Sequence, residues 1–353
     1  MRIIFLDCTN TPYNGETPKT KALGGIESTT VALAEAFATQ DYDVTVINHN
    51  KDNVDLCINA VKWRNYSVFD FKDQDNWPDI VIANNNARLF NHFPREFLNK
   101  KPQIFLWLHN PLSLLKTLKN KRLSSIIRWQ PTAIFLGQKQ LKACSFLIPF
   151  KRRIIIPHAI TEVFIHQETA SEKREKQAVY FSQAYRGFKE IVELWIKYVN
   201  STDQEAKLKA YIGDVNLIEL GIHYDKDELK AFNIFLMPKV SKEDLIEDLK
   251  RSRCMVYTGH KHETFCVAAI EANALGVPIV SYGRGSLSER IQNEVNGFLV
   301  RDNNDKLFAD KTLSLLNDDA LWRTMSCHSV DHVSSLTWKN AVQKWKSYAF
   351  QDR

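Results

Sequence analysis

Short runs of β-branched and aromatic residues alternate with helix-length stretches along most of this chain of 353 residues. This alternation is typical of strands that pair in parallel and are covered by helices on both faces. It predicts one group of strands that includes residues 3–6, 44–47, 80–83, 104–108, 133–136 and 153–156, and a second that includes residues 179–181, 209–212, 234–237, 254–257 and 278–281. We therefore predict an α/β chain of two doubly wound halves, which bind ligands at the carboxyl ends of their strands.

The pattern divides the chain into three parts. Residues 1–165 form a first domain, residues 166–330 a second domain, and residues 331–353 a terminal helix; the polar stretch 169–177 is interpreted as the linker. The terminal helix places five apolar side chains on one face, namely Trp338, Ala341, Val342, Trp345 and Tyr348. Such a stripe must be buried, so we expect the helix to pack back on the first domain or to cover a partner.

Charge is distributed unevenly along the chain, whose net charge is +6. The segment from Phe97 to Thr161 contains no acidic residue and twelve Lys or Arg residues. Within it, Leu112, Leu115 and Leu118 are interleaved with a basic patch of Lys116, Lys119, Lys121 and Arg122. Such a segment attracts the phosphates of nucleic acid, an anionic membrane surface or a phosphorylated substrate. A solvated surface without a partner is the alternative.

Several classes of protein are excluded. No apolar run approaches the roughly 18 residues of a membrane-spanning helix, and the N-terminus does not have the pattern of a secretory signal. With a mean hydropathy of -0.32, we expect a cytoplasmic protein. The six scattered cysteines form no C-x-x-C pair, and His260 and His262 lack a third ligand, so no metal is expected. No P-loop, G-x-G-x-x-G or Ser-His-Asp pattern indicates a kinase, dehydrogenase or hydrolase.

The most informative stretch is residues 260–280, which predicts a strand end, a polar turn and a helix over 265–275 with Thr264 as its N-cap. The backbone N–H groups that follow Thr264 would then favour an anion. Glu263 precedes this helix and Glu271 lies eight residues later, a rise of about 12 Å. The two carboxylates could contact different ends of a long ligand, and sugar hydroxyls would suit a buried Glu271. Alternatively, Glu271 pairs with a neighbouring cation and Glu263 caps the helix.

The segment Glu263 to Glu271 resembles the E-x7-E signature of the family 4 retaining glycosyltransferases. These have the GT-B fold, with two Rossmann-like domains facing a central cleft. The resemblance continues through residues 276–280, 285–289 and 296–300. It implies a hexosyltransferase that carries a sugar from a nucleoside-diphosphate-sugar donor to a saccharide acceptor, with retention and with no metal or cofactor. We expect front-face attack, because no carboxylate stands out as a nucleophile in the first domain.

The resemblance also implies roles for residues of the second domain. Glu271 would hold the ribose hydroxyls, and Glu263 would contact the hydroxyls of the transferred sugar. Arg186 matches the family's basic residue before glycine and would neutralise the leaving diphosphate. Ser182 stands where the family often has another basic residue, so Lys189 is the candidate for a second charge. The backbone N–H groups that would help to bind sugar and phosphate are those of Thr264, Phe265 and Cys266.

In the first domain, the Gly24-Gly25 turn resembles the family's loop that faces the donor phosphate and sugar. His109 resembles the family's histidine beside the reacting sugar, whose backbone carbonyl would stabilise the developing oxocarbenium charge. His158 departs from the family's usual Pro-Asn-Gly, so no role is assigned to it. Polar residues at strand ends are expected to line the acceptor side, namely Asn84, Asn85 and Asn110.

The basic patch indicates the acceptor. A lipid-linked saccharide, or a precursor of lipopolysaccharide or surface polysaccharide, would suit a protein that is peripheral on the inner face of the cell membrane. Two other functions stay open. One is a nucleotide-sugar epimerase of the same fold, and the other is a nucleic-acid-binding protein that uses the patch. We expect no nucleic-acid partner, because no RRM, KH or zinc-finger signature is present.

Overall fold

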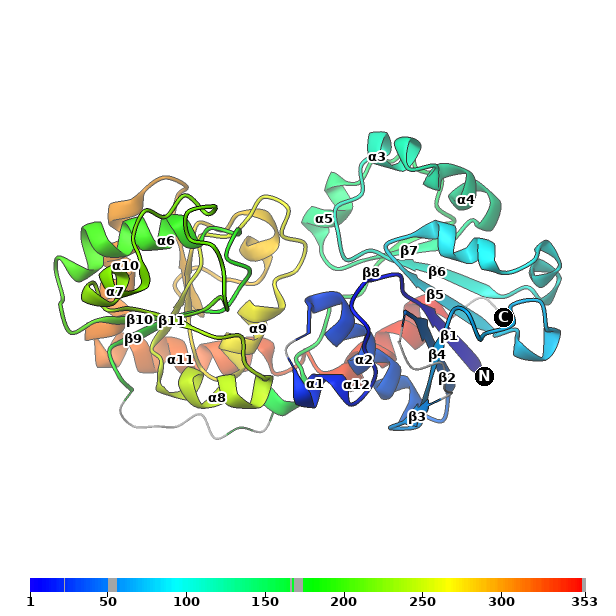
Figure 1. Cartoon of the computed structure of the whole chain (residues 1–353), viewed down its shortest axis with the longest axis horizontal. Coiled ribbons are helices and arrows are strands. Elements are labelled where there is room, and N and C mark those ends of the chain that lie inside the picture. Colours follow the sequence, from blue (N-terminus) through cyan, green and yellow to red (C-terminus); the bar gives the residue numbers. More distant parts are fainter. Residues whose placement is uncertain (22, 50–55, 166, 168–173, 351–353) are drawn as a thin grey trace. The chain divides into compact units, whose positions relative to one another are not determined.

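The computed structural model describes residues 1–21, 23–49, 56–165, 167 and 174–350, which form two compact units (Figure 1). Unit 1 comprises Met1–Ala159 together with Leu336–Arg353, and unit 2 comprises Ile160–Ser335. The chain thus enters unit 2 at Ile160 rather than at residue 166, and it returns to unit 1 at Leu336 rather than at residue 331. Residues 169–173 of the interpreted linker lie outside the described residues.

Eight strands form the sheet of unit 1, in the order β3-β4-β2-β1-β5-β6-β7-β8. Their bounds are β1 Arg2–Leu6, β2 Asp43–Asn48, β3 Leu56–Ile58, β4 Val61–Asn65, β5 Ile80–Asn84, β6 Gln103–Trp107, β7 Thr132–Phe135 and β8 Arg152–Ile155. Neighbouring strands pair in parallel, except for the short antiparallel pair β3 and β4, which the sequence analysis did not predict. Strand order reverses between β1 and β5, so their carboxyl ends flank the ligand crevice that this topology provides.

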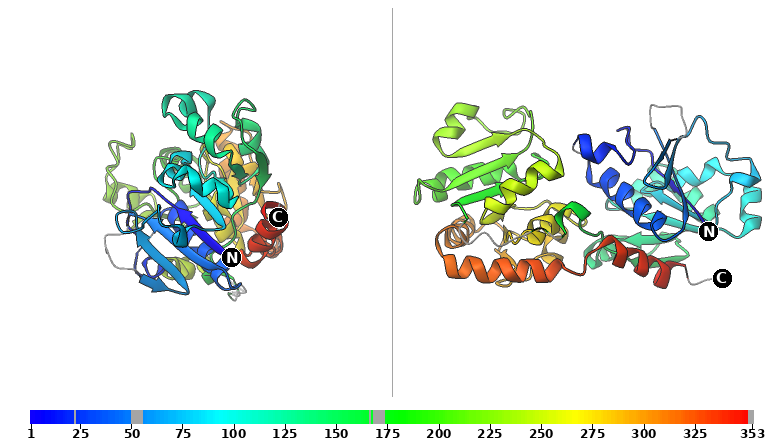
Figure 2. Two further views of the ribbon diagram at one scale, coloured as in Figure 1. Left: turned by 90° about the vertical axis from the view of Figure 1, so that its right-hand side faces the viewer. Right: turned by 90° about the horizontal axis from the view of Figure 1, so that it is seen from below.

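Helices cover both faces of this sheet (Figures 1 and 2). The helices of unit 1 are α1 Thr17–Thr20, α2 Gly25–Ala38, α3 Leu114–Lys119, α4 Arg122–Trp129, α5 Gln138–Ala143 and α12 Trp338–Lys344, with the short 3-10 helices η1 Gln74–Asn76, η2 Ala87–His92 and η3 Arg95–Lys100. α2 and α12 lie on one face, and α3, α4 and α5 lie on the other (Figure 1). The pleat explains these layers. Ile4 and Leu6 join the core that also holds Ile126 of α4, whereas Phe5 faces Phe37 of α2.

The last helical segment packs within unit 1. α12 continues into the wider helical turn η7 Trp345–Ala349. The buried ring of Trp345 has its centroid 5.5 to 6.2 Å from those of Phe37, Phe105 and Trp107. Tyr348 is the member of the predicted apolar stripe that stays exposed. The stripe is therefore covered by the sheet and α2 of unit 1.

Unit 2 is a six-stranded parallel sheet in the order β11-β10-β9-β12-β13-β14. Its strands are β9 Gln177–Tyr180, β10 Lys207–Tyr211, β11 Ile234–Met237, β12 Cys254–Val256, β13 Ile279–Ser281 and β14 Gly297–Leu299. Its helices are η4 Glu162–Phe164, α6 Phe188–Leu194, η5 Trp195–Asn200, α7 Lys226–Ala231, α8 Lys242–Arg251, α9 Val267–Ala274, η6 Gly285–Glu289, α10 Asp305–Asn317 and α11 Asp319–Val333. Strand order reverses here between β9 and β12, so the loops after these two strands adjoin.

The predicted fold class, two parallel α/β sheets with helices on their faces, is confirmed. Among the described residues, no helix has the length and apolar character needed to cross a bilayer.

Candidate functional site

The centre of the site in unit 2 is the carboxylate of Glu263, which lies in the loop after β12. Arg186, in the loop after β9, donates a hydrogen bond from Nη1 to Glu263 Oε2 over 2.8 Å, and the Tyr257 hydroxyl donates to the same oxygen over 3.0 Å. The backbone N–H of Cys266 donates to Glu263 Oε1 over 3.2 Å. The carboxylate is thus buried among three donors, one of which is a cation. Two candidates drawn from distant parts of the sequence, Arg186 and Glu263, meet here.

Arg186 remains partly accessible although it is paired. Burial acts to lower the pKa of its guanidinium, but the charge of Glu263, together with the hydroxyls of Tyr185 and Tyr257, raises that pKa overall, so Arg186 is cationic at any physiological pH. The turn that presents it depends on Gly187, whose φ is +104° and whose Cβ, if present, would lie 2.0 Å from Thr258 Oγ1. No other residue fits this close approach.

The helix after Glu263 starts later than predicted. α9 begins at Val267, and the preceding residue Cys266 has the left-handed φ of +66°, so the predictions of a helix from residue 265 and of Thr264 as its N-cap are wrong. The physical reason is that Glu263 reaches forward and accepts the Cys266 N–H. Thr264 and Phe265 are buried in the loop before the helix. Of the three backbone N–H groups predicted for the donor, that of Cys266 is therefore already engaged within the protein.

Glu271 lies in the middle of α9 and its side chain is 0% exposed. Its Oε2 accepts from Lys242 Nζ at 2.5 Å, and its Oε1 accepts from Thr161 Oγ1 at 2.9 Å. This is the alternative foreseen for Glu271, pairing with a neighbouring cation. Lys242 is the first residue of α8, and neither it nor Thr161 was predicted from the sequence. No local spacing could reveal them, because the contacts depend on how α8 and the chain before η4 pack against α9.

Lys189, the candidate for a second cation, has a different partner. It forms an ion pair with Glu193 one turn further along α6, and both side chains are largely exposed. Instead of Lys189, Lys242 is the second cation that the structure places beside one of the predicted carboxylates, that of Glu271.

In unit 1, the Gly24-Gly25 turn leads into α2. A Cβ on Gly24 would lie 2.4 Å from Glu27 Oε2, whereas a Cβ on Gly25 would meet no described atom within 4 Å. Gly24 therefore leaves room for the Glu27 carboxylate, and Gly25 leaves space at the start of the helix. Glu27 is buried, and burial is the main cause that raises the pKa of its carboxyl. A hydrogen bond from its own backbone N–H acts to lower this pKa, and the charge of Asp7 acts to raise it.

A second buried carboxylate follows β1. Asp7 accepts hydrogen bonds from the Thr9 hydroxyl at 2.6 Å and the Tyr13 hydroxyl at 2.8 Å. From the sequence, no carboxylate of the first domain stood out as a nucleophile, but Asp7, directly after β1, and Glu27, in the first turn of α2, are both buried. The position of Asp7 directly after a buried strand was the signal that could have identified it.

His109, at the end of β6, is brought together with the asparagines after β5. Its Nε2 lies 3.2 Å from Asn84 Oδ1, and its backbone N–H donates to Asn85 Oδ1 over 2.7 Å. The backbone N–H of Asn110 donates to the same Asn85 oxygen, and Asn84 Nδ2 donates to Thr30. Parallel pairing of β5 with β6 produces this cluster, since Asn84 lies opposite Trp107. The Asn84 amide is buried and used within the protein, so it orients His109.

The environment of His109 keeps its ring neutral. The ring stacks on that of His158, with centroids 5.1 Å apart, and contacts Trp107. Burial lowers the pKa of His109 to about 3. At neutral pH, the residue can therefore offer a polar ring and a backbone carbonyl but no positive charge.

The basic patch divides in the structure. Lys116 and Lys119 of α3 and Lys121 after it are exposed, while the partly buried Arg122 donates from Nη1 to the carbonyl of Asn85 over 3.2 Å. Arg122 thus supports the loop that holds His109.

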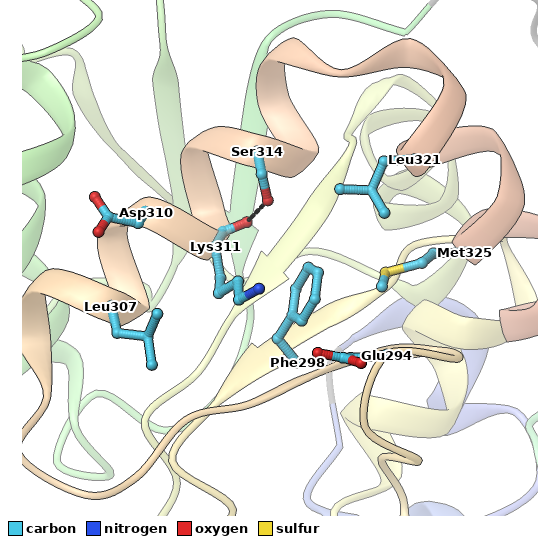
Figure 3. Close-up of a pocket in the computed structure, with 8 residues that line it drawn as sticks. All are labelled: Glu294, Phe298, Leu307, Asp310, Lys311, Ser314, Leu321 and Met325. Atoms are coloured by element: carbon cyan, nitrogen blue, oxygen red, sulfur yellow. Dashed lines mark hydrogen bonds between the residues drawn. The ribbon is translucent and has the colours of Figure 1, made fainter.

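A further cavity in unit 2, of about 430 Å³, contains none of the predicted residues (Figure 3). It lies between the edge strand β14 and helices α10 and α11, where Lys311 Nζ stands 4.5 Å from the centre of the Phe298 ring. The other residues that line it are Glu294, Leu307, Asp310, Ser314, Leu321 and Met325. In the described parts of the chain, no three His, Cys, Asp or Glu side chains come together as metal ligands.

Comparison with known proteins agrees with this geometry. Residues 165–327 match the family Glycosyl transferases group 1. D-inositol 3-phosphate glycosyltransferase 1 of Catenulispora acidiphila is 27% identical over 99 residues, which are 28% of this chain and 24% of that protein. The match therefore spans about a quarter of the length of this curated relative.

Two solved structures share the fold over nearly the whole chain. Sucrose-phosphate synthase from Thermosynechococcus elongatus has a TM-score of 0.71 and 14% identity, over 99% of this chain and 98% of its own. Anabaena HepE, solved in complex with UDP, has a TM-score of 0.71 and 14% identity, over 98% of this chain and 99% of its own. The family match confirms the family predicted from the E-x7-E segment, and these neighbours confirm the predicted fold.

Proposed function

Because residues 165–327 belong to the Glycosyl transferases group 1 family, we propose that this chain is a retaining glycosyltransferase with a nucleoside-diphosphate-sugar donor. The observation that carries the proposal is the buried Glu263 held by the cation Arg186 at the switch point of the unit 2 sheet, with Glu271 eight residues further on. UDP is the nucleotide proposed first, since the structural neighbour HepE was solved with UDP.

In the proposed reaction, the bond between the anomeric carbon and the β-phosphate oxygen breaks while the acceptor oxygen bonds to the same face of the sugar. The acceptor proton passes to the departing phosphate oxygen. Arg186 keeps further N–H donors besides the one given to Glu263, and it would neutralise the diphosphate as negative charge develops. Glu263 would hold Arg186 in place and accept from the hydroxyls of the transferred sugar. Glu271 would exchange part of its present contact with Lys242 for the ribose hydroxyls.

Two features of unit 1 would suit the same reaction. The space beside Gly25 at the start of α2 would admit a phosphate or sugar group close to backbone N–H groups. His109 would offer its carbonyl to the developing oxocarbenium charge, and its neutral ring, oriented by Asn84, would contact a sugar hydroxyl.

We further propose that the acceptor is a lipid-linked saccharide or a precursor of lipopolysaccharide or surface polysaccharide, extended at the inner face of the cell membrane. The exposed Lys116, Lys119 and Lys121 support an acceptor or surface that carries phosphate. The name of the curated relative, D-inositol 3-phosphate glycosyltransferase, likewise refers to a phosphorylated compound.

The donor assignment is tested by thermal shift with UDP, GDP and ADP and with their sugars. A bound donor at 100 times its Kd adds about 2.7 kcal/mol of stability. We expect UDP and a UDP-sugar to raise Tm, and Glu271→Ala to abolish the shift, because the ribose hydroxyls lose their acceptor. Glu193→Ala, an exposed glutamate of α6, is the control and should keep the full shift.

A Glu271→Ala variant that binds UDP as well as the parent chain would contradict the ribose assignment, and no shift with any nucleotide would contradict the proposed donor class. Conversion of a nucleotide-sugar without any acceptor would identify the epimerase function instead.

A further inference from the structure

Large apolar side chains are exposed on one part of unit 1. Leu115, Leu118, Ile127, Phe146 and Leu147 are each at least half exposed, and Phe146 is 84% exposed. All five belong to the segment that has no acidic residue. They do not belong to the core on this face of the sheet, which takes Ile126 and Trp129 from α4 and leaves the neighbouring Ile127 outside.

Phe146 and Leu147 stand on a loop whose backbone is held in place. The guanidinium of Arg153 donates to the carbonyls of Cys144, Ser145 and Ile148 over 3.4, 2.7 and 3.0 Å. Cys144 and Ile148 are buried on either side of the tip. The two exposed side chains are therefore presented by a built loop, because a strong cationic donor fixes both ends of it.

The same segment carries exposed cations. Besides Lys100 and Lys101, which precede β6, the exposed lysines and arginine of this segment are Lys116, Lys119, Lys121, Arg128, Lys139, Lys142 and Lys151. α3, α4 and α5, which carry or adjoin them, lie on the same side of the sheet, opposite α2 and α12 (Figure 1). Apolar side chains among lysines, with no carboxylate in the segment, match the chemistry of an anionic lipid surface.

We propose that this docking surface, formed by α3, α4 and the loop 144–148, binds an anionic lipid bilayer. Phe146 and Leu147 insert below the headgroups while the lysines contact lipid phosphates. The inference deepens the proposed function and rests on it only for the nature of the acceptor, since docking itself needs no sugar transfer. It fits a bilayer better than a second copy, because two such surfaces facing each other would bring like charges together.

Nucleic acid fits this surface less well. Phe146 is the single aromatic among the five exposed side chains, whereas binding of single strands without sequence preference uses several stacking rings. Four exposed aliphatic side chains gain nothing from a phosphate backbone but gain free energy when lipid chains cover them.

The test is flotation of the full chain with vesicles of phosphatidylcholine alone and of phosphatidylcholine mixed with phosphatidylglycerol. We expect binding to the mixed vesicles only. Phe146→Ser with Leu147→Ser should lower the partition coefficient at least about tenfold, because two side chains lose their apolar burial. Lys119→Glu with Lys142→Glu should lower it similarly. Ile218→Ser is the matched control, since Ile218 of unit 2 is 73% exposed but stands beside Glu219, and it should bind like the parent.

Equal binding to both kinds of vesicle, no flotation, or an unchanged partition coefficient in the Phe146 and Leu147 variant would each overturn the proposal. Self-association that sedimentation detects in the parent and not in this variant would assign the surface to a second copy. The UDP thermal shift, measured on the same variants, should persist and shows that they are folded. If the chain binds only the mixed vesicles while no nucleotide raises Tm, the results support the docking surface and contradict the proposed donor.

Discussion

At the scale of single residues, the site depends on charges that neutralise each other. Glu263 is buried and would be costly as a lone carboxylate, but Arg186, Tyr257 and a backbone N–H supply its donors. The sequence predicted Glu263 and Arg186 because both lie in motifs with a fixed spacing. Lys242 and Thr161 could not be predicted, since their contacts with Glu271 join segments 29 and 110 residues away.

His109 gives the stability of unit 1 a dependence on pH. Burial lowers its pKa to about 3 in the folded chain, against 6.5 for an ordinary histidine. Above pH 6.5, His109 is neutral in both the folded and the unfolded chain, and the free energy of unfolding does not depend on its titration. Between pH 6.5 and the folded pKa, only the unfolded chain binds the proton, so the free energy of unfolding falls by about 1.4 kcal/mol for each pH unit. His109→Gln removes this effect, because glutamine does not titrate.

We therefore expect the parent chain to lose roughly 2 kcal/mol relative to His109→Gln between pH 7 and pH 5. Urea unfolding of unit 1 at both pH values measures the difference. His328→Gln, at an exposed position of α11, is the control. Parallel pH dependence of the parent and His109→Gln would show that the pKa of this ring is the same in the folded and unfolded chains and would contradict the prediction.

At the scale of elements, α9 is fixed at both ends by contacts that its own sequence does not contain. Glu263 determines where it begins, and the buried Arg174 holds the turn directly after its last residue, by donating to the carbonyls of Leu275 and Gly276 as well as to that of Ser252. Strands and most helices could be predicted from periodicity. The start of α9 was misplaced by two residues because a side chain, rather than propensity, sets it.

We expect Arg174→Met to destabilise unit 2 by about 3 to 5 kcal/mol, because three buried carbonyls lose a charged donor. Lys176→Met is a suitable control, as this lysine is partly exposed and forms ion pairs with Asp203 and with the exposed Glu205. Chemical denaturation of both variants gives the comparison. A loss below about 1 kcal/mol in Arg174→Met would mean that water replaces the arginine.

At the scale of the whole molecule, unit 1 takes its core from both ends of the sequence. Trp345 fills the space between α2 and the sheet, against Phe37, Phe105 and Trp107. The sequence showed that the apolar stripe of the terminal helix must be buried, but it left open whether the first domain or a partner buries it. The reason is that a helical pattern does not specify the surface against which the helix packs.

Trp345→Ala should cost unit 1 roughly 3 to 5 kcal/mol, the usual range for a large aromatic removed from a core. Hydrogen exchange would show faster opening of β1 and β6 but unchanged protection of β9 and β12. Tyr348→Ala, at the exposed position of the same segment, should leave both sheets as they are. Faster exchange in unit 2 after Trp345→Ala would contradict the assignment of this helix to unit 1.

The discontinuous composition of unit 1 has a consequence for the nascent chain on the ribosome. Ile160–Ser335 is one uninterrupted stretch, so every strand of unit 2 has been synthesised before Trp345 is added. Domains generally fold as units while they emerge from the ribosome. The N-terminal sheet is translated first, but one of its apolar faces stays uncovered until Trp345 has been synthesised. The half that is synthesised first is therefore the half whose core is completed last.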